Sequence, residues 1–81
     1  MQNGQIVIVK KAQHELNHRP VLLSEIGDGH HIVERLEEQS LPSGKRRVTM
    51  LHQSFLETIS KERQLQIANT MGLRLERLPY D

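Results

Sequence analysis

The chain has 81 residues, of which 36% are hydrophobic, and its formal net charge at neutral pH is +1. This length fits a single small domain spanning residues 1–81, with an aliphatic core because the chain holds one Phe, one Tyr and no Trp. The absence of cysteine excludes a disulfide framework and thiolate chemistry. The net charge is too close to zero to indicate nucleic-acid binding by the chain as a whole.

The sequence carries no membrane or export signal. No apolar run approaches the roughly 20 residues of a membrane helix. The first residues, Met1–Gly4, lack the basic and apolar regions of a signal peptide. We therefore expect a soluble, cytoplasmic protein without a membrane partner.

Two apolar runs predict the first strands of a sheet. Gln5–Val9 is dominated by Ile and Val, which favour strands. Val21–Ile26 follows Pro20, and this proline disfavours helical backbone at Arg19. The intervening residues 12–18 have little β character, so they are interpreted as a loop or one short helix.

The dipeptide Asp28-Gly29 lies between apolar runs and predicts a hairpin. The expected turn is type I′, which needs positive φ at both central residues. Ile32–Gln39 follows and has two interpretations. Period two would place Ile32 and Leu36 on one face of a strand, whereas its Glu, Arg, Leu and Gln content favours a helix. We interpret it as a strand and keep the helix as the alternative.

A second turn signal, Pro42-Ser43-Gly44, precedes a predicted strand at Arg46–Leu51. From Val48 to Ile59, however, apolar residues also recur at helical spacing. In that alternative, residues 51–56 form one helical turn or begin a helix. The chain would then approximate a helix-turn-helix.

The strongest helix prediction begins at Ser60, a favourable N-cap residue, and ends at Gly72, a favourable residue just past a helix. Leu73–Leu78 alternates apolar and charged residues and is predicted to return as a final strand. The helix is expected to pack an apolar face on the sheet, formed by Leu65, Ala68 and Met71. Its exposed polar groups are expected to be Lys61, Arg63, Gln64, Gln66 and Asn69.

These elements predict an α+β fold, a small β-meander or partly open barrel of four or five strands with a C-terminal helix. The pattern that carries a family resemblance is formed by Gly4, Val7, Val9, Val21, Leu22, Ile26, Gly29, Ile32, Leu36, Val48, Leu51 and Leu56. It resembles the small Src-homology-3-like and Tudor-like barrels and is most similar to the C-terminal domains of retroelement integrases. The resemblance covers residues 4–59 and implies nucleic-acid binding or protein recruitment. The chain departs from that family at the aromatic positions, where it offers only Phe55 and Tyr80.

Local clusters of cations are the best candidate contact surface. On a strand, Lys45 and Arg47 would share one face while Arg46 takes the other. Displayed cations of this kind contact phosphates. The alternative is a solvated strand edge that charge protects against aggregation. The nucleic-acid-binding residues predicted from the sequence and the resemblance are Lys10, Lys11, Lys45, Arg46 and Arg47.

One segment matches a metal-binding pattern. His14-Glu15-Leu16-Asn17-His18 fits H-E-x-x-H, which in zinc proteases places two histidines on one helix face beside a general-base Glu. Here it is a short stretch between a strand and a proline, so an exposed polar loop is the expected structure. If metal were bound, His14 and His18 would be the ligands, with a third from His30, His31, Glu25 or Glu34. We expect no cofactor and no catalytic residue.

The sequence thus predicts a non-enzymatic binding module that contacts nucleic acid weakly through a local basic surface. A protein-interaction or dimer-forming adaptor or regulator, including a homodimer, is the first alternative. A small zinc-binding protein using residues 14–18 is the second.

Overall fold

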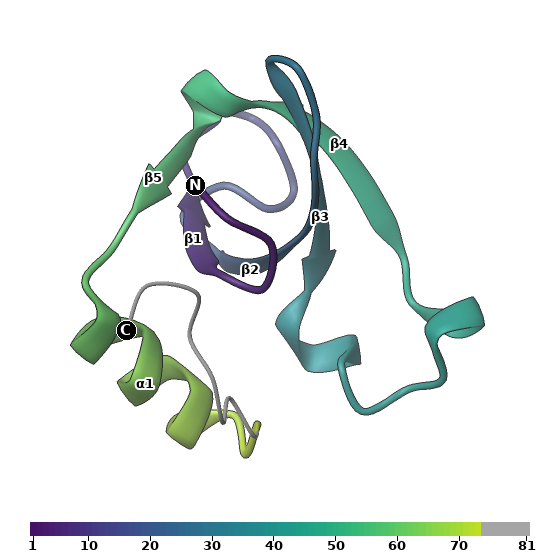
Figure 1. The fold of residues 1–81 in the computed structure, drawn as a ribbon, viewed down its shortest axis with the longest axis vertical. Helices are drawn as coiled ribbons and strands as arrows, with labels where there is room; N and C mark the ends of the chain where they lie inside the picture. Colours follow the sequence, from purple (N-terminus) through teal and green to yellow (C-terminus); the bar gives the residue numbers. More distant parts are fainter. Residues whose placement is uncertain (74–81) are drawn as a thin grey trace.

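The computed structural model describes residues 1–73 and confirms the predicted fold class (Figure 1). Five antiparallel strands form one open sheet, and a helix follows the last strand. The strands and the α-helix are β1 (Ile6–Val9), β2 (Pro20–Ile26), β3 (His30–Arg35), β4 (Val48–His52), β5 (Leu56–Thr58) and α1 (Lys61–Thr70). Three 3₁₀ turns connect them, η1 (Leu36–Glu38), η2 (Ser43–Lys45) and η3 (Gln53–Phe55).

The strand order is β4-β3-β2-β1-β5, so β4 and β5 are the two edges of the sheet. The sheet is strongly curled. This follows from Leu51 on one edge strand and Leu56 on the other, which belong to the same buried cluster. This cluster fills the concave face with aliphatic side chains, which are Val7, Val9, Leu16, Val21, Leu23, Val33, Leu51 and Leu56. The alternation of buried residues in β2 and β3 is what a half-buried sheet requires.

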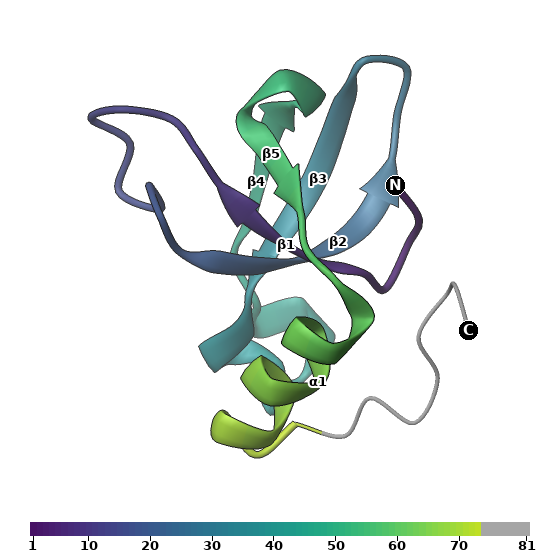
Figure 2. The ribbon, with the colours of Figure 1, turned by 90° about the vertical axis from the view of Figure 1, so that its left-hand side faces the viewer.

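A second, smaller core lies between the sheet and α1. Ile6 and Leu36 pack there against Ile67 and Ala68 of the helix. Figure 2 shows α1 lying below the sheet beside η1 and η2, and the loop between β1 and β2 projecting away from the sheet. The fold therefore has one core inside the curled sheet and one under the helix.

Gln64 fixes the helix to the sheet through its side-chain amide. The ladder between β1 and β5 begins at Val7, which pairs with Thr58, so Ile6 lies beyond the register pairs of that ladder. Gln64 Oε1 accepts a hydrogen bond from the Ile6 N–H at 2.9 Å, and Gln64 Nε2 donates to the Ile59 carbonyl at 3.2 Å. The amide thus bonds a buried strand donor where β5 has ended.

The predicted helix is confirmed at its ends but only in part in its buried face. Ser60 Oγ accepts from the Arg63 N–H at 3.0 Å, and Gly72 has a φ of +69°. The side chain of Gln64, expected to be exposed, is fully buried, whereas Leu65 and Met71 are 40% and 38% exposed. The sheet contacts the helix on the side of Gln64, Ile67 and Ala68, so the predicted apolar face is confirmed at Ala68 and wrong at Leu65 and Met71.

The hairpin between β2 and β3 is confirmed, but the predicted type I′ turn is wrong. The connection is Gly27-Asp28-Gly29, and of these three only Gly29 has a positive φ, +88°. Glycine is needed at position 27 for a steric reason rather than for a positive φ, because a Cβ there would overlap the carbonyl oxygen of His30.

Both ambiguous segments contain strands. Residues 32–35 complete β3, and residues 36–38 form η1, so the strand prediction for residues 32–39 is right only in its first half. A helix through residues 48–59 is wrong, since β4 and β5 occupy the two ends of that range, but η3 at Gln53–Phe55 is the single helical turn that the alternative allowed within residues 51–56. The predicted strand at residues 46–51 is confirmed from Val48. The predicted final strand lies outside the described residues from position 74 onward.

The described part of the chain contains no helix that is long and apolar enough to cross a membrane.

Candidate nucleic-acid interface

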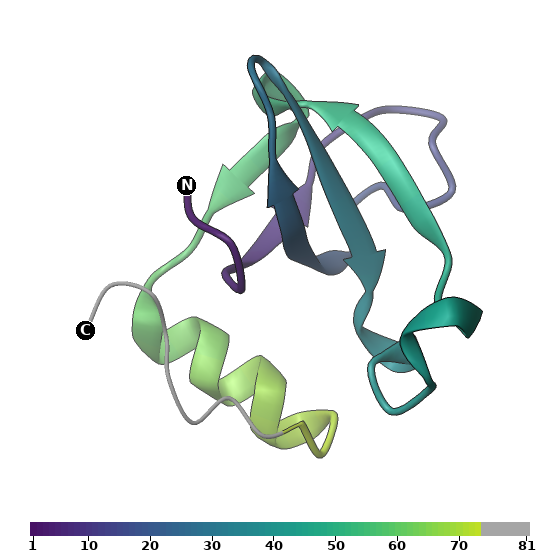
Figure 3. The same cartoon turned by 45° about the vertical axis from the view of Figure 1, so that its right-hand side comes forward.

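The structure separates the five predicted contact residues into two groups. Lys45–Arg47 immediately precede β4, whereas η3 immediately follows it. The Lys10 N–H bonds the Phe55 carbonyl of η3 at 2.7 Å, which places Lys10 near the far end of that strand. A five-residue strand is about 17 Å long. Figure 3 shows η2 and the loop after β1 well apart, so the two groups do not form one continuous basic surface.

In the group that precedes β4, Arg46 and Arg47 are held by carboxylates. Arg46 Nη1 lies 3.4 Å from Glu34 Oε1 and donates to Gln39 Oε1 at 3.0 Å. Residues 45–47 precede β4 rather than forming part of it, so the expected alternation of their side chains across a strand is wrong. Lys45, in η2, has no ion pair among the described residues.

Glu38 binds Arg47 through both carboxylate oxygens. Its Oε1 accepts from the Arg47 backbone N–H at 2.7 Å, and its Oε2 accepts from Nε at 2.6 Å. The hydrogen bonds from the Arg47 side chain, and then from its backbone, lower the pKa of the buried Glu38 carboxyl. The Arg47 guanidinium therefore already forms an ion pair with a carboxylate of the same chain.

The other predicted contact residues, Lys10 and Lys11, lie at the start of the loop between β1 and β2. The His18 N–H donates to the Val9 carbonyl at 2.7 Å, and the Val9 N–H donates to the Arg19 carbonyl at 3.0 Å, which closes the loop base. Lys10 Nζ lies 3.4 Å from His18 Nδ1. Lys11 Nζ lies 4.8 Å from the centre of the Phe55 ring, within cation–π range.

The cations near this loop lack carboxylate partners. Within residues 1–73, Lys10, Lys11 and Arg19 make no ion pair, and neither does Arg63 on α1. All except the half-buried Lys11 are exposed residues. Glu57 on β5 is an acidic residue close to this face, since it pairs in register with Ile8.

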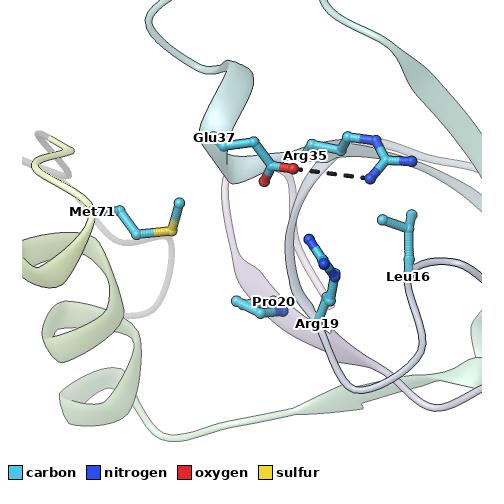
Figure 4. A pocket seen from close by; sticks show the side chains of 6 residues that line it. All are labelled: Leu16, Arg19, Pro20, Arg35, Glu37 and Met71. Carbon is cyan, nitrogen blue, oxygen red and sulfur yellow. Dashed lines mark ion pairs between the residues drawn. The ribbon is translucent and has the colours of Figure 1, made fainter.

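A pocket adjoins the loop base and is shown in Figure 4. Its volume is about 160 Å³, and its lining residues are Leu16, Arg19, Pro20, Arg35, Glu37 and Met71. A second hollow of about 370 Å³ shares two of these residues and is lined by Pro20, Arg63, Ile67, Thr70 and Met71. The two hollows share Pro20 and Met71 and lie between the start of β2 and α1, and together we call them the Pro20–Met71 groove.

Arg35 is the buried cation of this groove, with a side chain only 10% exposed. Its Nη2 donates to Glu15 Oε1 at 2.6 Å, and its Nη1 lies 3.9 Å from Glu37 Oε1. Two carboxylates therefore offset its charge. Arg19, which faces the same pocket, has no side-chain partner among the described residues and keeps its donors available.

The segment that matches the metal pattern forms turns rather than a helix. His14 Nδ1 accepts from the Leu16 N–H at 3.0 Å, and Glu15 binds Arg35. His30 lies against His52, with ring centroids 4.9 Å apart. Across residues 1–73, no three His, Cys, Asp or Glu side chains are grouped as a metal site would need.

Arg19 and Arg63 were missed by the sequence analysis as members of this surface. The sequence marks Arg19 only as the residue before Pro20, and Arg63 only as an exposed group of a helix that could read base edges, not as part of a surface shared with the loop. Their proximity depends on α1 packing beneath the start of β2, which the sequence does not specify. A sequence signal existed for Arg19 alone, since His18-Arg19-Pro20 places a cation at the end of a loop that Lys10 and Lys11 begin.

Comparison with known proteins adds no relative, since no family model, no curated protein and no solved structure matches the chain.

Proposed function

We propose that this protein is a small binding module that contacts the phosphates of nucleic acid through the loop between β1 and β2 and the adjoining end of α1. We call this basic surface the loop face and define it by Lys10, Lys11, Arg19 and Arg63. The observation that carries the proposal is the lack of carboxylate partners for these four cations within the described residues.

The proposal shifts the contact surface away from Arg46 and Arg47. Both side chains already bind acidic residues, so the charge that each could offer to a phosphate is offset by Glu34 or Glu38. Lysines and arginines without such a partner displace the cations condensed on the nucleic acid when they meet its phosphates, and this release is the main source of nonspecific affinity. The resemblance to small barrels that bind nucleic acid is consistent with this role.

A salt titration tests the proposal. Fluorescence anisotropy of a labelled 20-nucleotide single strand would be measured between 50 and 200 mM salt. If four cations each contact one phosphate, the slope of log K against log salt is about −3. Lys10→Gln and Arg19→Gln should each weaken binding and reduce the magnitude of the slope by about 0.7.

Lys45→Gln is the matched control, because it removes the same charge from an exposed, unpaired lysine near the other end of β4. It should leave the affinity and the slope unchanged. Equal losses from Lys10→Gln and Lys45→Gln would contradict the proposed surface, and binding that does not weaken with salt would contradict phosphate contact.

We propose self-association through β4 as a second candidate function, because this edge strand displays apolar side chains. Val48 and Met50 are 61% and 63% exposed, and they project from the same face of the strand. Exposed apolar edges pair readily with another strand, and antiparallel pairing with β4 of a second copy is self-complementary. Sedimentation equilibrium should show a dimer that Met50→Lys abolishes and Leu65→Lys, at an exposed helical site, preserves. A monomer at all concentrations would exclude it.

A further inference from the structure

We propose that the Pro20–Met71 groove accepts one unstacked base of a single-stranded nucleic acid. This inference rests on the proposed function and names the form of nucleic acid that the loop face would bind. It starts from the shape of the groove. Met71 approaches from the end of α1 and Pro20 from the start of β2, and both line each of the two hollows (Figure 4).

The groove combines apolar walls with cations. Leu16, Pro20 and Met71 line the inner pocket, and Ile67 lines the outer hollow. Arg19 also lines the inner pocket and Arg63 the outer hollow. A base flanked by two phosphates has the complementary pattern, with a flat apolar face between two anions.

The Glu37 carboxylate lines the inner pocket and makes it less favourable for a second carboxylate. Glu15 and Glu37 already offset the charge of Arg35, so a carboxylate entering from an acidic peptide would face Glu37 at close range. A base edge carries both donors and acceptors. It is therefore suited to a site where the Arg35 guanidinium donates and the Glu37 carboxylate accepts.

A duplex cannot use the groove in this way. Its bases are paired and stacked, and extracting one costs a few kcal/mol. Phosphate contacts on the loop face would remain available to both forms. The groove thus predicts a preference for single strands over duplexes that the cations alone would not produce.

Methyl NMR of the wild-type chain tests the inference with internal controls, because the chain has only three methionines. The probe is a 12-nucleotide single strand of mixed sequence, compared with its duplex. Binding of the single strand should shift the methyl resonance of Met71, while Met50 on β4 and Met1 stay in place. The duplex should leave all three unchanged.

Affinity measurements complete the test. Met71→Ala should weaken single-strand binding by roughly five-fold, since it removes apolar contact area, and should not alter duplex binding. Leu65→Ala, which truncates a similarly exposed side chain on α1, should alter neither. An oligoglutamate peptide of matching charge should not shift the Met71 methyl resonance.

The outcomes separate the two proposals. Equal affinity for single strand and duplex with an unshifted Met71 methyl would overturn base insertion and leave the loop face intact. Binding of neither form would overturn the proposed function itself. A Met71 shift with the acidic peptide, but not with the single strand, would overturn the assignment of the groove to nucleic acid.

Discussion

Replacing Gln64 with alanine should destabilise the whole domain, because this side chain joins α1 to the sheet. Gln64 is fully buried and bonds both the Ile6 N–H and the Ile59 carbonyl. Alanine would leave the Ile6 N–H buried without a partner. The same change removes the amide that holds the start of α1 against β1.

The loss in the free energy of unfolding can be worked from these contacts. A buried unsatisfied N–H costs about 1–3 kcal/mol, and loss of the bond to Ile59 costs about 1 kcal/mol. Removal of the buried methylene adds about 1 kcal/mol. Burying a glutamine side chain costs rotamer entropy that burying alanine does not, and this difference offsets about 1.5 kcal/mol of the loss. The net loss is about 1.5–3.5 kcal/mol, which lowers the Tm of a domain of this size by roughly 6–28 °C at about 4–8 °C per kcal/mol.

Thermal and urea unfolding followed by circular dichroism measure this loss. Gln66→Ala is the matched control, because Gln66 is exposed on the same helix and its side-chain amide oxygen is 3.4 Å from an arginine nitrogen. It should change the stability by less than about 0.5 kcal/mol. If Gln64→Ala and Gln66→Ala lower the Tm equally, the buried amide does not have the role we assign to it.

Three further predictions concern acid stability and the hairpin. Because hydrogen bonds from Arg47 lower the pKa of Glu38, its carboxylate stabilises the fold above its unfolded pKa, near 4.5, and that contribution disappears as pH falls through the lower folded value. Glu38→Gln should therefore lower the Tm at pH 7, and the difference from wild type should shrink as pH falls below 4.5 and vanish below the folded pKa, whereas a constant difference would contradict the ion pair. Gly27→Ala should cost about 1–3 kcal/mol in urea unfolding, since its methyl group would overlap the His30 carbonyl. Gly44→Ala, where no atom lies within 4 Å of the added methyl, should cost less than about 0.5 kcal/mol, and a cost as large as that of Gly27→Ala would refute the steric argument.

Local signals in the sequence predicted most of the fold. The β-branched run before Lys10 and the apolar run after Pro20 are strands, and Ser60 caps the helix through its hydroxyl. These features depend on neighbouring residues alone. The Asp-Gly signal also marked a true chain reversal. The connection has three residues, Gly27-Asp28-Gly29, instead of the expected two-residue turn.

The buried face of α1 could not be predicted in this way. Leu65 is more hydrophobic than Gln64, and composition alone would bury the leucine. The end of the β1–β5 ladder decides otherwise, because the Ile6 N–H needs an acceptor at that place. A requirement created by the end of another strand is a tertiary property, so helical periodicity does not reveal it.

The candidate site was predicted in part for a similar reason. The sequence showed where cations lie along the chain but not which of them face carboxylates. Arg46 and Arg47 fold against Glu34 and Glu38, which precede them by nine residues or more. Lys10 and Lys11 remained candidates because their loop projects from the sheet (Figure 2).

Amide chemical-shift mapping tests the central claim most directly. The wild-type protein would be titrated with a single-stranded 12-nucleotide probe at 50 mM salt. The account predicts shifts at Lys10, Lys11, Arg19 and Arg63 that disappear at high salt. Shifts confined to residues 45–47, or no shift at any of these positions, would contradict it.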